Sequence, residues 1–196
     1  MKTIALLLIC TATFAQQKGT FTDSQDRKTY KTVKIGTQTW MAENLNYDAS
    51  GSVCYENNSA NCEKYGRLYN WETALKACPK GWHLPSKDEY EVLDKAVGGE
   101  NLAGKKLKSK SGWNGTDEFG FSALPGGSGY SNGNFYTVGY GGYWWSSTEG
   151  SSFSAYYRDM NYDLEHAYWD SISKDYLFSV RCVQDETEKI LRSNRK

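Results

Sequence analysis

Four cysteines constrain the fold of this 196-residue chain more than any other feature. Cys54, Cys62, Cys78 and Cys182 remain once the first 15 residues are set aside, and four cysteines allow three pairings. The residues between Cys54 and Cys62 are polar and typical of a loop, so these two can close a short ring. Cys78 and Cys182 each lie on an apolar stripe, so they can meet in the interior. We expect the pairs Cys54–Cys62 and Cys78–Cys182, with free or metal-bound thiols as the alternative.

The N-terminus has the pattern of an export signal. Lys2 precedes a short apolar run at residues 4–12, and Ala15 ends a small-x-small cleavage site. An apolar run of this length is too short to span a bilayer as a stable helix. We expect residues 1–15 to be a cleaved signal peptide and the protein to be secreted or at the cell surface, with the periplasm as the alternative. No later segment is expected to cross a membrane.

The remainder is long enough for one domain with a real core. We expect a loose N-terminal segment at residues 16–28, a folded domain at 29–184 and a polar tail at 185–196. The chain has 23 basic and 23 acidic residues, interspersed along its length. A neutral, mixed charge pattern does not favour binding of nucleic acid or of an anionic membrane.

The first half of the domain predicts a hairpin and then helices. Strand-forming residues at 29–35 and 39–42 flank a short turn with glycine, as in a β-hairpin. Residues 46–61 are expected to be loop. One apolar face of a first helix then recurs at helical spacing: Leu68, Trp71, Leu75 and Cys78.

A second helix is expected to begin at Ser86, because Ser86 and Glu89 have the spacing of a capping box. Gly98 and Gly99 end it. Residues 101–108 predict a short third helix. The expected apolar face of the second helix comprises Tyr90, Leu93, Ala96 and Val97.

The second half of the domain is rich in glycine and aromatic residues. Residues 125–143 are too rich in glycine for a helix and too aromatic for a flexible linker, so we expect a long ordered loop. Four strand-like segments follow at 144–147, 155–161, 166–172 and 176–183. Alternation in the last of them directs Cys182 inward. The predicted fold class is α+β, with two or three helices against short, mostly antiparallel strands.

The residues give little support for a metal site. His83 and His166 lie far apart in the sequence, and we expect His83 to be a partly buried, hydrogen-bonded imidazole. One run of oxygen ligands has the spacing of a calcium loop: Asp159, Asn161 and Asp163. Its sixth position is Leu164 where such loops need glycine, and its flanks resemble strands. A hairpin turn with solvated carboxylates is the favoured interpretation, and no cofactor is expected.

No catalytic residue is identified. The chain lacks a nucleophile elbow and a phosphate-binding loop, and the cysteines are assigned to disulfides. A pair of carboxylates could still hydrolyse a glycosidic bond, because their separation cannot be read from a sequence.

Aromatic residues supply the best candidates for ligand contact. The chain has 7 Trp and 15 Tyr, and exposed aromatic faces stack on the apolar faces of sugars. The alternative is that most of them pack among the glycine-rich loops. Those flanked by glycine are the candidates for exposure: Tyr130, Tyr136, Tyr140 and Tyr143.

Residues 26–184 contain a series of specific motifs: YKTVKIGTQTWMAENL at 30–45, YGRLYNW at 65–71, ACPKGWHLP at 77–85, GFSALPGG at 120–127, WSS at 145–147 and VRC at 180–182. Together these motifs resemble the major paralogous domain described from Fibrobacter succinogenes. The resemblance implies a bacterial, exported domain with a lectin-like fold.

Residues 71–78 (WETALKAC) and 81–86 (GWHLPS) resemble the helix pair of C-type-lectin-like domains. That resemblance implies a disulfide between Cys78 and Cys182 in the last strand. The triplet that binds calcium and sugar in many lectins is missing, so we carry over no such site. Residues 83–91 (HLPSKDEYE) also resemble formylglycine-generating enzymes, but the paired catalytic cysteines have no equivalent, so we do not carry over that activity.

We therefore expect a secreted, non-catalytic binding module for polysaccharide or cell-surface glycan. A surface module that binds another protein is one alternative. An enzyme that uses an unrecognised pair of carboxylates is the other.

Overall fold

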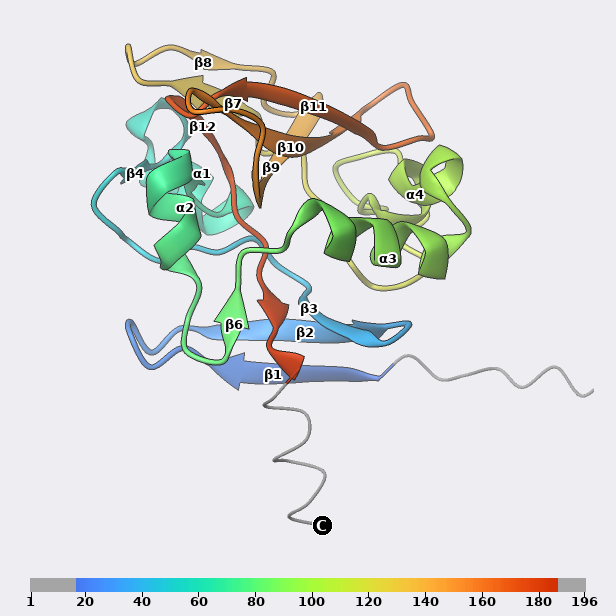
Figure 1. Ribbon diagram of the computed structural model, residues 1–196. Helices are drawn as coiled ribbons and strands as arrows, with labels where there is room; N and C mark the ends of the chain where they lie inside the picture. The colour runs from blue at the N-terminus through green and yellow to red at the C-terminus, as the bar shows by residue number, and fades with distance from the viewer. Residues whose placement is uncertain (1–16, 187–196) are drawn as a thin grey trace, which may run out of the picture.

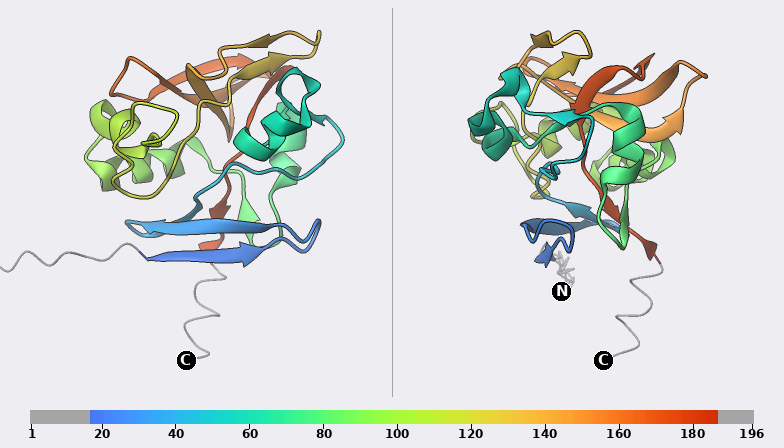
Figure 2. Two further views of the ribbon diagram at one scale, coloured as in Figure 1. Left: turned by 180° about the vertical axis from the view of Figure 1, so that it is seen from behind. Right: turned by 90° about the vertical axis from the view of Figure 1, so that its left-hand side faces the viewer.

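The computed structural model describes residues 17–186. The expected signal peptide at 1–15 lies outside the described residues, as does most of the expected tail. The elements form two sheets at opposite ends of the molecule, with the helices between them on two sides (Figures 1 and 2). The α+β class is confirmed, and pairing between the strands is antiparallel in every ladder but one.

The first sheet joins the two ends of the described chain. Its strand order is β1 (Lys18–Thr22), β2 (Thr29–Ile35), β3 (Gln38–Met41), β13 (Val183–Gln184) and β6 (Trp82–His83). The predicted hairpin is β2–β3, turning at Gly36, which has a φ of +58°. The segment at 16–28 was expected to be loose, but its residues 18–22 form a strand that pairs with all but the last two residues of β2. Apolar alternation does not reveal this strand, because β1 is largely exposed.

The second sheet contains the rest of the strands. Its order is β11 (Tyr168–Ser173), β10 (Ser154–Asn161), β9 (Gly141–Glu149), β12 (Tyr176–Ser179), β5 (Leu68–Tyr69) and β4 (Ser52–Val53), with β7 (Ser128–Tyr130) and β8 (Phe135–Tyr136) paired beside β12. The glycine-rich region at 125–143 is therefore part strand. Because β10 and β11 pair directly, the expected hairpin turn between them is confirmed.

Four α-helices are present in residues 17–186, where two or three were expected. They are α1 (Ser59–Tyr65), α2 (Trp71–Ala77), α3 (Lys87–Val97) and α4 (Glu100–Leu107), and a 3₁₀ turn, η1 (Tyr55–Asn57), precedes α1. The prediction of loop up to residue 61 is wrong for α1. Its N-cap is Asn58, whose side chain accepts a hydrogen bond from the Ala60 amide, and Cys62 is its buried residue. One buried position in seven residues leaves no helical stripe to recognise.

Helix α2 is shorter than predicted. Leu68 lies in β5 and Leu75 is 37% exposed, so the predicted stripe is wrong at these two positions. Asn70 caps the helix by accepting from the Thr73 amide, which moves its start past Leu68. Its buried face consists of Trp71, Ala74 and Ala77.

Helix α3 follows the prediction closely. Ser86 and Glu89 form both halves of the capping box, and Gly98 ends the helix with a φ of +104°. Ala96, expected on the apolar face, is exposed, and Asp94 is buried in its place. The other expected members of the face are buried: Tyr90, Leu93 and Val97.

Both expected disulfides are present. Cys54 pairs with Cys62 across 8 positions, and Cys78 pairs with Cys182 across 104. Cys182 is fully buried, so the end of α2 is tied to the last part of the chain inside the core. In the chain-entropy model a loop of this length stabilises the fold by about 4–5 kcal/mol.

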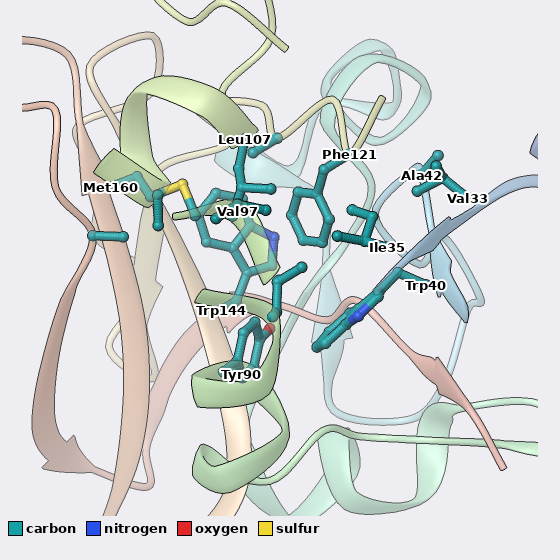
Figure 3. Packing of buried hydrophobic residues seen from close by; sticks show 14 of the residues in the cluster. Val33, Ile35, Trp40, Ala42, Tyr90, Val97, Leu107, Phe121, Trp144 and Met160 are labelled. Carbon is teal, nitrogen blue, oxygen red and sulfur yellow. The ribbon is translucent and has the colours of Figure 1, made fainter. Parts of the chain in front are cut away.

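The largest apolar cluster lies between α3, α4 and the two sheets. Trp40 from β3, Tyr90 from α3 and Trp144 from β9 form its aromatic centre, and aliphatic residues such as Leu107 fill the space around them (Figure 3). Trp40 and Tyr90 have ring centroids 5.0 Å apart. This cluster fixes the orientation of α3 and α4 against the sheets.

A buried polar hub joins the segment after β3 and the segment before β13 to β9 of the second sheet. The side-chain oxygen Oδ1 of Asn44 accepts hydrogen bonds from Arg181 Nη2 at 2.7 Å and from Trp144 Nε1 at 2.9 Å. The side-chain nitrogen Nδ2 of Asn44 donates to the backbone carbonyl oxygen of Tyr65 at 2.8 Å. Arg181 is fully buried, and burial lowers its pKa to about 10.

Candidate functional site

Exposed tyrosines lie at the end of β8, in the turn that follows it and in the β10–β11 turn. Tyr136, the last residue of β8, and Tyr140, in the turn after β8, are 47% and 46% exposed. Tyr162, in the β10–β11 turn, is 49% exposed. Val138 (36% exposed) and Asp163 lie in the same two turns. We refer to the set Tyr136, Val138, Tyr140, Tyr162 and Asp163 as the tyrosine face.

The two turns meet at Tyr140. Its ring lies nearly parallel to that of Tyr162, with centroids 6.5 Å apart and an interplanar angle of 26°. Its hydroxyl donates a hydrogen bond to Asp163 Oδ1 at 2.8 Å, and this bond raises the pKa of the Tyr140 phenol. The face thus offers apolar rings beside a carboxylate and phenolic hydroxyls.

A tight turn holds Tyr140 toward solvent. The Thr137 carbonyl accepts from the amides of Tyr140 and Gly141 at 3.0 and 2.9 Å, and Gly139 has a φ of +82°. The indole of Trp113, itself buried, donates to the Tyr140 carbonyl at 3.2 Å. Because the Tyr140 carbonyl is hydrogen-bonded to the buried Trp113, the Tyr140 ring points toward solvent.

Two of the four predicted tyrosines are not presented to solvent in this way. Tyr130 is half-buried and packs on Tyr176, with ring centroids 4.8 Å apart. Tyr143 is half-buried against Phe178 at 5.3 Å. Tyr130 in β7 and Tyr143 in β9 point toward these rings, whereas Tyr136, although also on a strand, is 47% exposed. The expectation of exposure was wrong for these two and correct for Tyr136 and Tyr140.

Tyr162 and Val138 belong to the tyrosine face but were not predicted from the sequence. Tyr162 lies between Asn161 and Asp163 in the β10–β11 turn, where no neighbouring strand covers a side chain. An aromatic residue in a polar hairpin turn is therefore a signal that could have found it. For Val138 we see no comparable signal.

The carboxylates of the calcium-like run do not point to a common centre. Asp159 is buried and accepts a hydrogen bond from Asn161 Nδ2 at 2.8 Å, whereas Asp163 accepts from Tyr140. Within residues 17–186 no group of three or more His, Cys, Asp or Glu side chains is placed to hold a metal ion.

His83 bridges two carboxylates as a structural group. Its Nε2 is 2.7 Å from Glu89 Oε1, and its Nδ1 is 2.6 Å from Asp185 Oδ1. The hydrogen bond to Glu89 raises the pKa of His83 to about 9, against the opposing effect of burial. The expectation of a hydrogen-bonded, partly buried imidazole is confirmed.

A hollow of about 450 Å³ beside α3 contains carboxylates. Glu91, Asp94 and Glu100 line it together with Trp169. Burial raises the pKa of Asp94 to about 6, but its Oδ1 is 2.5 Å from Nη2 of the fully buried Arg158. Asp94 therefore serves as the counterion of a buried guanidinium, a pair that is costly to break.

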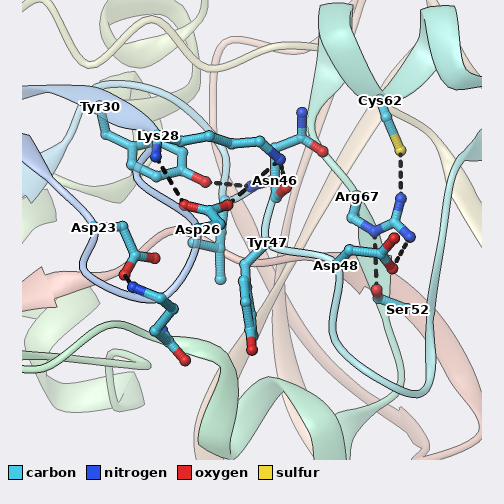
Figure 4. A network of polar contacts seen from close by, with 12 residues as sticks. Asp23, Asp26, Lys28, Tyr30, Asn46, Tyr47, Asp48, Ser52, Cys62 and Arg67 are labelled. Carbon is cyan, nitrogen blue, oxygen red and sulfur yellow. Dashed lines mark hydrogen bonds and ion pairs between the residues drawn. The ribbon is translucent and has the colours of Figure 1, made fainter.

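A second hollow, of about 260 Å³, lies between the first sheet and α1. Figure 4 shows the polar contacts near it. The Tyr30 hydroxyl accepts from the Asn46 amide at 3.1 Å, and Lys28 donates to the Asn46 carbonyl. These bonds tie the loop at Asn46 to β2 along one wall of the hollow.

Comparison with family models matches residues 33–184 to the Fibrobacter succinogenes major domain. No curated protein matches the chain, and no solved structure does. In the part that the structure describes, no helix has the length and apolar character needed to cross a bilayer.

Proposed function

This chain belongs to the Fibrobacter succinogenes major domain family, and we propose that it is a secreted, non-catalytic module that binds polysaccharide or cell-surface glycan through the tyrosine face. The observation that carries the proposal is the pair of exposed, nearly parallel rings of Tyr140 and Tyr162 beside Asp163.

The chemistry of the face fits a sugar ring. The apolar C–H faces of a sugar stack on aromatic rings, and sugar hydroxyls need donors and acceptors beside those rings. Tyr140 and Asp163 supply both within 2.8 Å of each other. Tyrosine also loses little side-chain entropy when it is immobilised, since it has only two side-chain torsions.

We also propose that the fold is C-type-lectin-like. The disulfide from the end of α2 to Cys182, and the sheet in which β13 lies beside β3 and β6, support this assignment. Export to the cell surface or medium, with the periplasm as the alternative, is supported by two disulfides within one domain, because such bonds persist in oxidising compartments.

The same exposed patch would suit a protein partner, which is why binding must be tested with glycans alone. The carboxylates of the hollow beside α3 are the observation that favours an enzyme. Asp94, one of these carboxylates, is instead the counterion of the buried Arg158. An enzyme would release reducing sugar from polysaccharide, with loss of activity in Glu91→Gln or Glu100→Gln.

Binding to insoluble plant polysaccharides and to a glycan array tests the proposal. We expect Tyr140→Ala and Tyr162→Ala each to weaken binding about tenfold, the equivalent of about 1.4 kcal/mol. Phe153→Ala is the matched control. Phe153 is 82% exposed but precedes β10, whereas Tyr162 follows it, a separation of roughly 25–30 Å along the strand. Binding that Phe153→Ala reduces as strongly as Tyr140→Ala would contradict the assignment of the face.

A further inference from the structure

Lys108 is a buried cation directly beneath the tyrosine face. It follows α4 and is 1% exposed. Its Nζ lies 2.7 Å from the Asn161 carbonyl oxygen, 2.7 Å from that of Leu164 and 3.4 Å from that of Tyr162. The two short bonds, with the longer contact to Tyr162, direct the ammonium into the β10–β11 turn.

Lys108 supplies charged hydrogen-bond donors to the carbonyl oxygens of the turn. A lysine ammonium has three donors and no acceptor, so it matches a concave set of carbonyl oxygens. The carbonyls of residues 161–164 lie beyond the last pair of the β10–β11 ladder, Asp159 with Tyr168, so their donors come from outside that ladder. The Leu164 amide donates to Asn161 and Asn114 donates to Tyr162, and Lys108 adds a charged donor to Asn161 and Leu164. Buried carbonyls without a donor would cost free energy, and a charged donor makes the stronger type of hydrogen bond.

The turn is also seated on α4. The Lys105 amide donates to the Glu165 carbonyl at 2.7 Å. Gly104 lies so close that a Cβ there would be 2.3 Å from the carbonyl oxygen of His166. Asn114 donates to the Tyr162 carbonyl from the other side. With these contacts in place, Lys108 occupies the inside of a turn whose outside carries Tyr162 and Asp163.

We propose that Lys108 is the positioning residue of the tyrosine face: its ammonium is the built-in cation around which the 161–164 turn folds, so that Tyr162 and Asp163 meet Tyr140 in the binding geometry. The inference rests on the proposed function for its ligand, but the effect on the turn does not depend on any ligand.

The electrostatic surroundings agree with this role. Burial lowers the pKa of Lys108 to about 8, and the charged groups that act on it, Asp163 and Glu165, partly offset that effect. Glu165 is also paired with Lys105, whose Nζ is 2.5 Å from its Oε1. The charged form of Lys108 is therefore stabilised by groups of the turn and its flank: the carbonyls of Asn161 and Leu164 and the carboxylates of Asp163 and Glu165.

Hydrogen exchange on the full chain tests the proposal. The Leu164 amide donates to the Asn161 carbonyl, which is one of the oxygens that Lys108 binds. We expect Lys108→Met to increase exchange of the Leu164 amide at least tenfold at pH 7, while amides of α3 keep their protection. Lys105→Met is the control, because it removes an exposed ammonium of α4 that pairs with Glu165, next to the same turn. It should leave Leu164 unchanged.

Affinity for polysaccharide gives a second readout. Lys108→Met should bind as weakly as Tyr162→Ala, and adding Tyr162→Ala to it should cause little further loss. Unchanged exchange of Leu164 in a folded Lys108→Met protein would overturn the inference. Where that variant does not fold, wild-type exchange is compared at pH 7 and pH 9 after correction for intrinsic rates. Protection of Leu164 should fall selectively at pH 9, and equal protection would overturn the inference. If Leu164 responds but the wild type binds no glycan, the proposed function fails and the role of Lys108 stands.

Discussion

Replacing Asn44 with alanine should destabilise the domain by about 3–5 kcal/mol. The substitution removes two hydrogen bonds that Arg181 donates, from Nε at 3.1 Å and from Nη2 at 2.7 Å, and one from Trp144 Nε1. Bonds to a charged group contribute about 1.5–3 kcal/mol each, so the loss of two such bonds accounts for about 3–5 kcal/mol. Arg181 is fully buried, so water does not replace the lost acceptor.

Chemical unfolding in guanidinium chloride, followed by circular dichroism, measures this loss. The midpoint should fall while the slope of the transition stays the same, because the change acts on stability and not on the surface exposed. Asn101→Ala is the control: it makes the same chemical change on the exposed side of α4 and should alter stability by less than about 0.5 kcal/mol.

A double-mutant cycle separates the energy of the Asn44–Arg181 hydrogen bonds from the energy lost through poorer packing. Once Arg181 is replaced, Asn44→Ala no longer leaves a buried guanidinium without its acceptor. The double variant Asn44→Ala/Arg181→Met should therefore be less destabilised than the sum of the two single variants, by about 1–3 kcal/mol. A loss below about 1 kcal/mol in Asn44→Ala, or additivity within 0.5 kcal/mol in the cycle, would refute the reasoning.

Three further predictions concern pH, covalent closure and calcium. Because its pKa is raised, His83 stabilises the folded state fully below pH 6.5 and loses this contribution as the pH rises through about 9. Melting curves should therefore show that the wild type loses about 1 kcal/mol of stability over that range, a value reduced for the 41% exposure of the side chain. The His83→Gln variant should not show this loss. Replacing Cys78 and Cys182 together with serine should cost about 4 kcal/mol in chemical unfolding; a loss below 1 kcal/mol would mean that the closed loop does not restrict the unfolded chain. Millimolar calcium should leave the melting temperature unchanged, because Lys108 already occupies the carbonyls of the 161–164 turn; a rise of several degrees would show a cation site there.

Local chemistry predicted those parts of the fold that depend on a few neighbouring residues. The capping box of Ser86 and Glu89, the hairpin of β2 and β3, and the pairing of Cys78 with Cys182 all follow from spacing and alternation. The helix stripe through Leu68 and Leu75 was wrong because Asn70 begins the helix later, and a cap overrides an apolar period that continues before it.

The candidate site was predictable only in part, because exposure depends on partners that lie far away in the sequence. Tyr130 and Tyr140 have similar glycine-rich flanks, yet Tyr130 packs on Tyr176 and Tyr140 does not. Lys108 could not have been recognised from its sequence context, since the carbonyls that it binds lie more than 50 positions later. A buried lysine after a short helix looks, in a sequence, like part of a solvated basic face.

The most direct test of the proposed glycan binding is a depletion isotherm on the insoluble polysaccharide that retains the wild-type protein best. We predict saturable binding by the wild type and by Phe153→Ala, with the dissociation constant about tenfold higher for Tyr140→Ala. Equal retention of the Tyr140→Ala protein, or no retention of the wild type by any polysaccharide, would contradict the account.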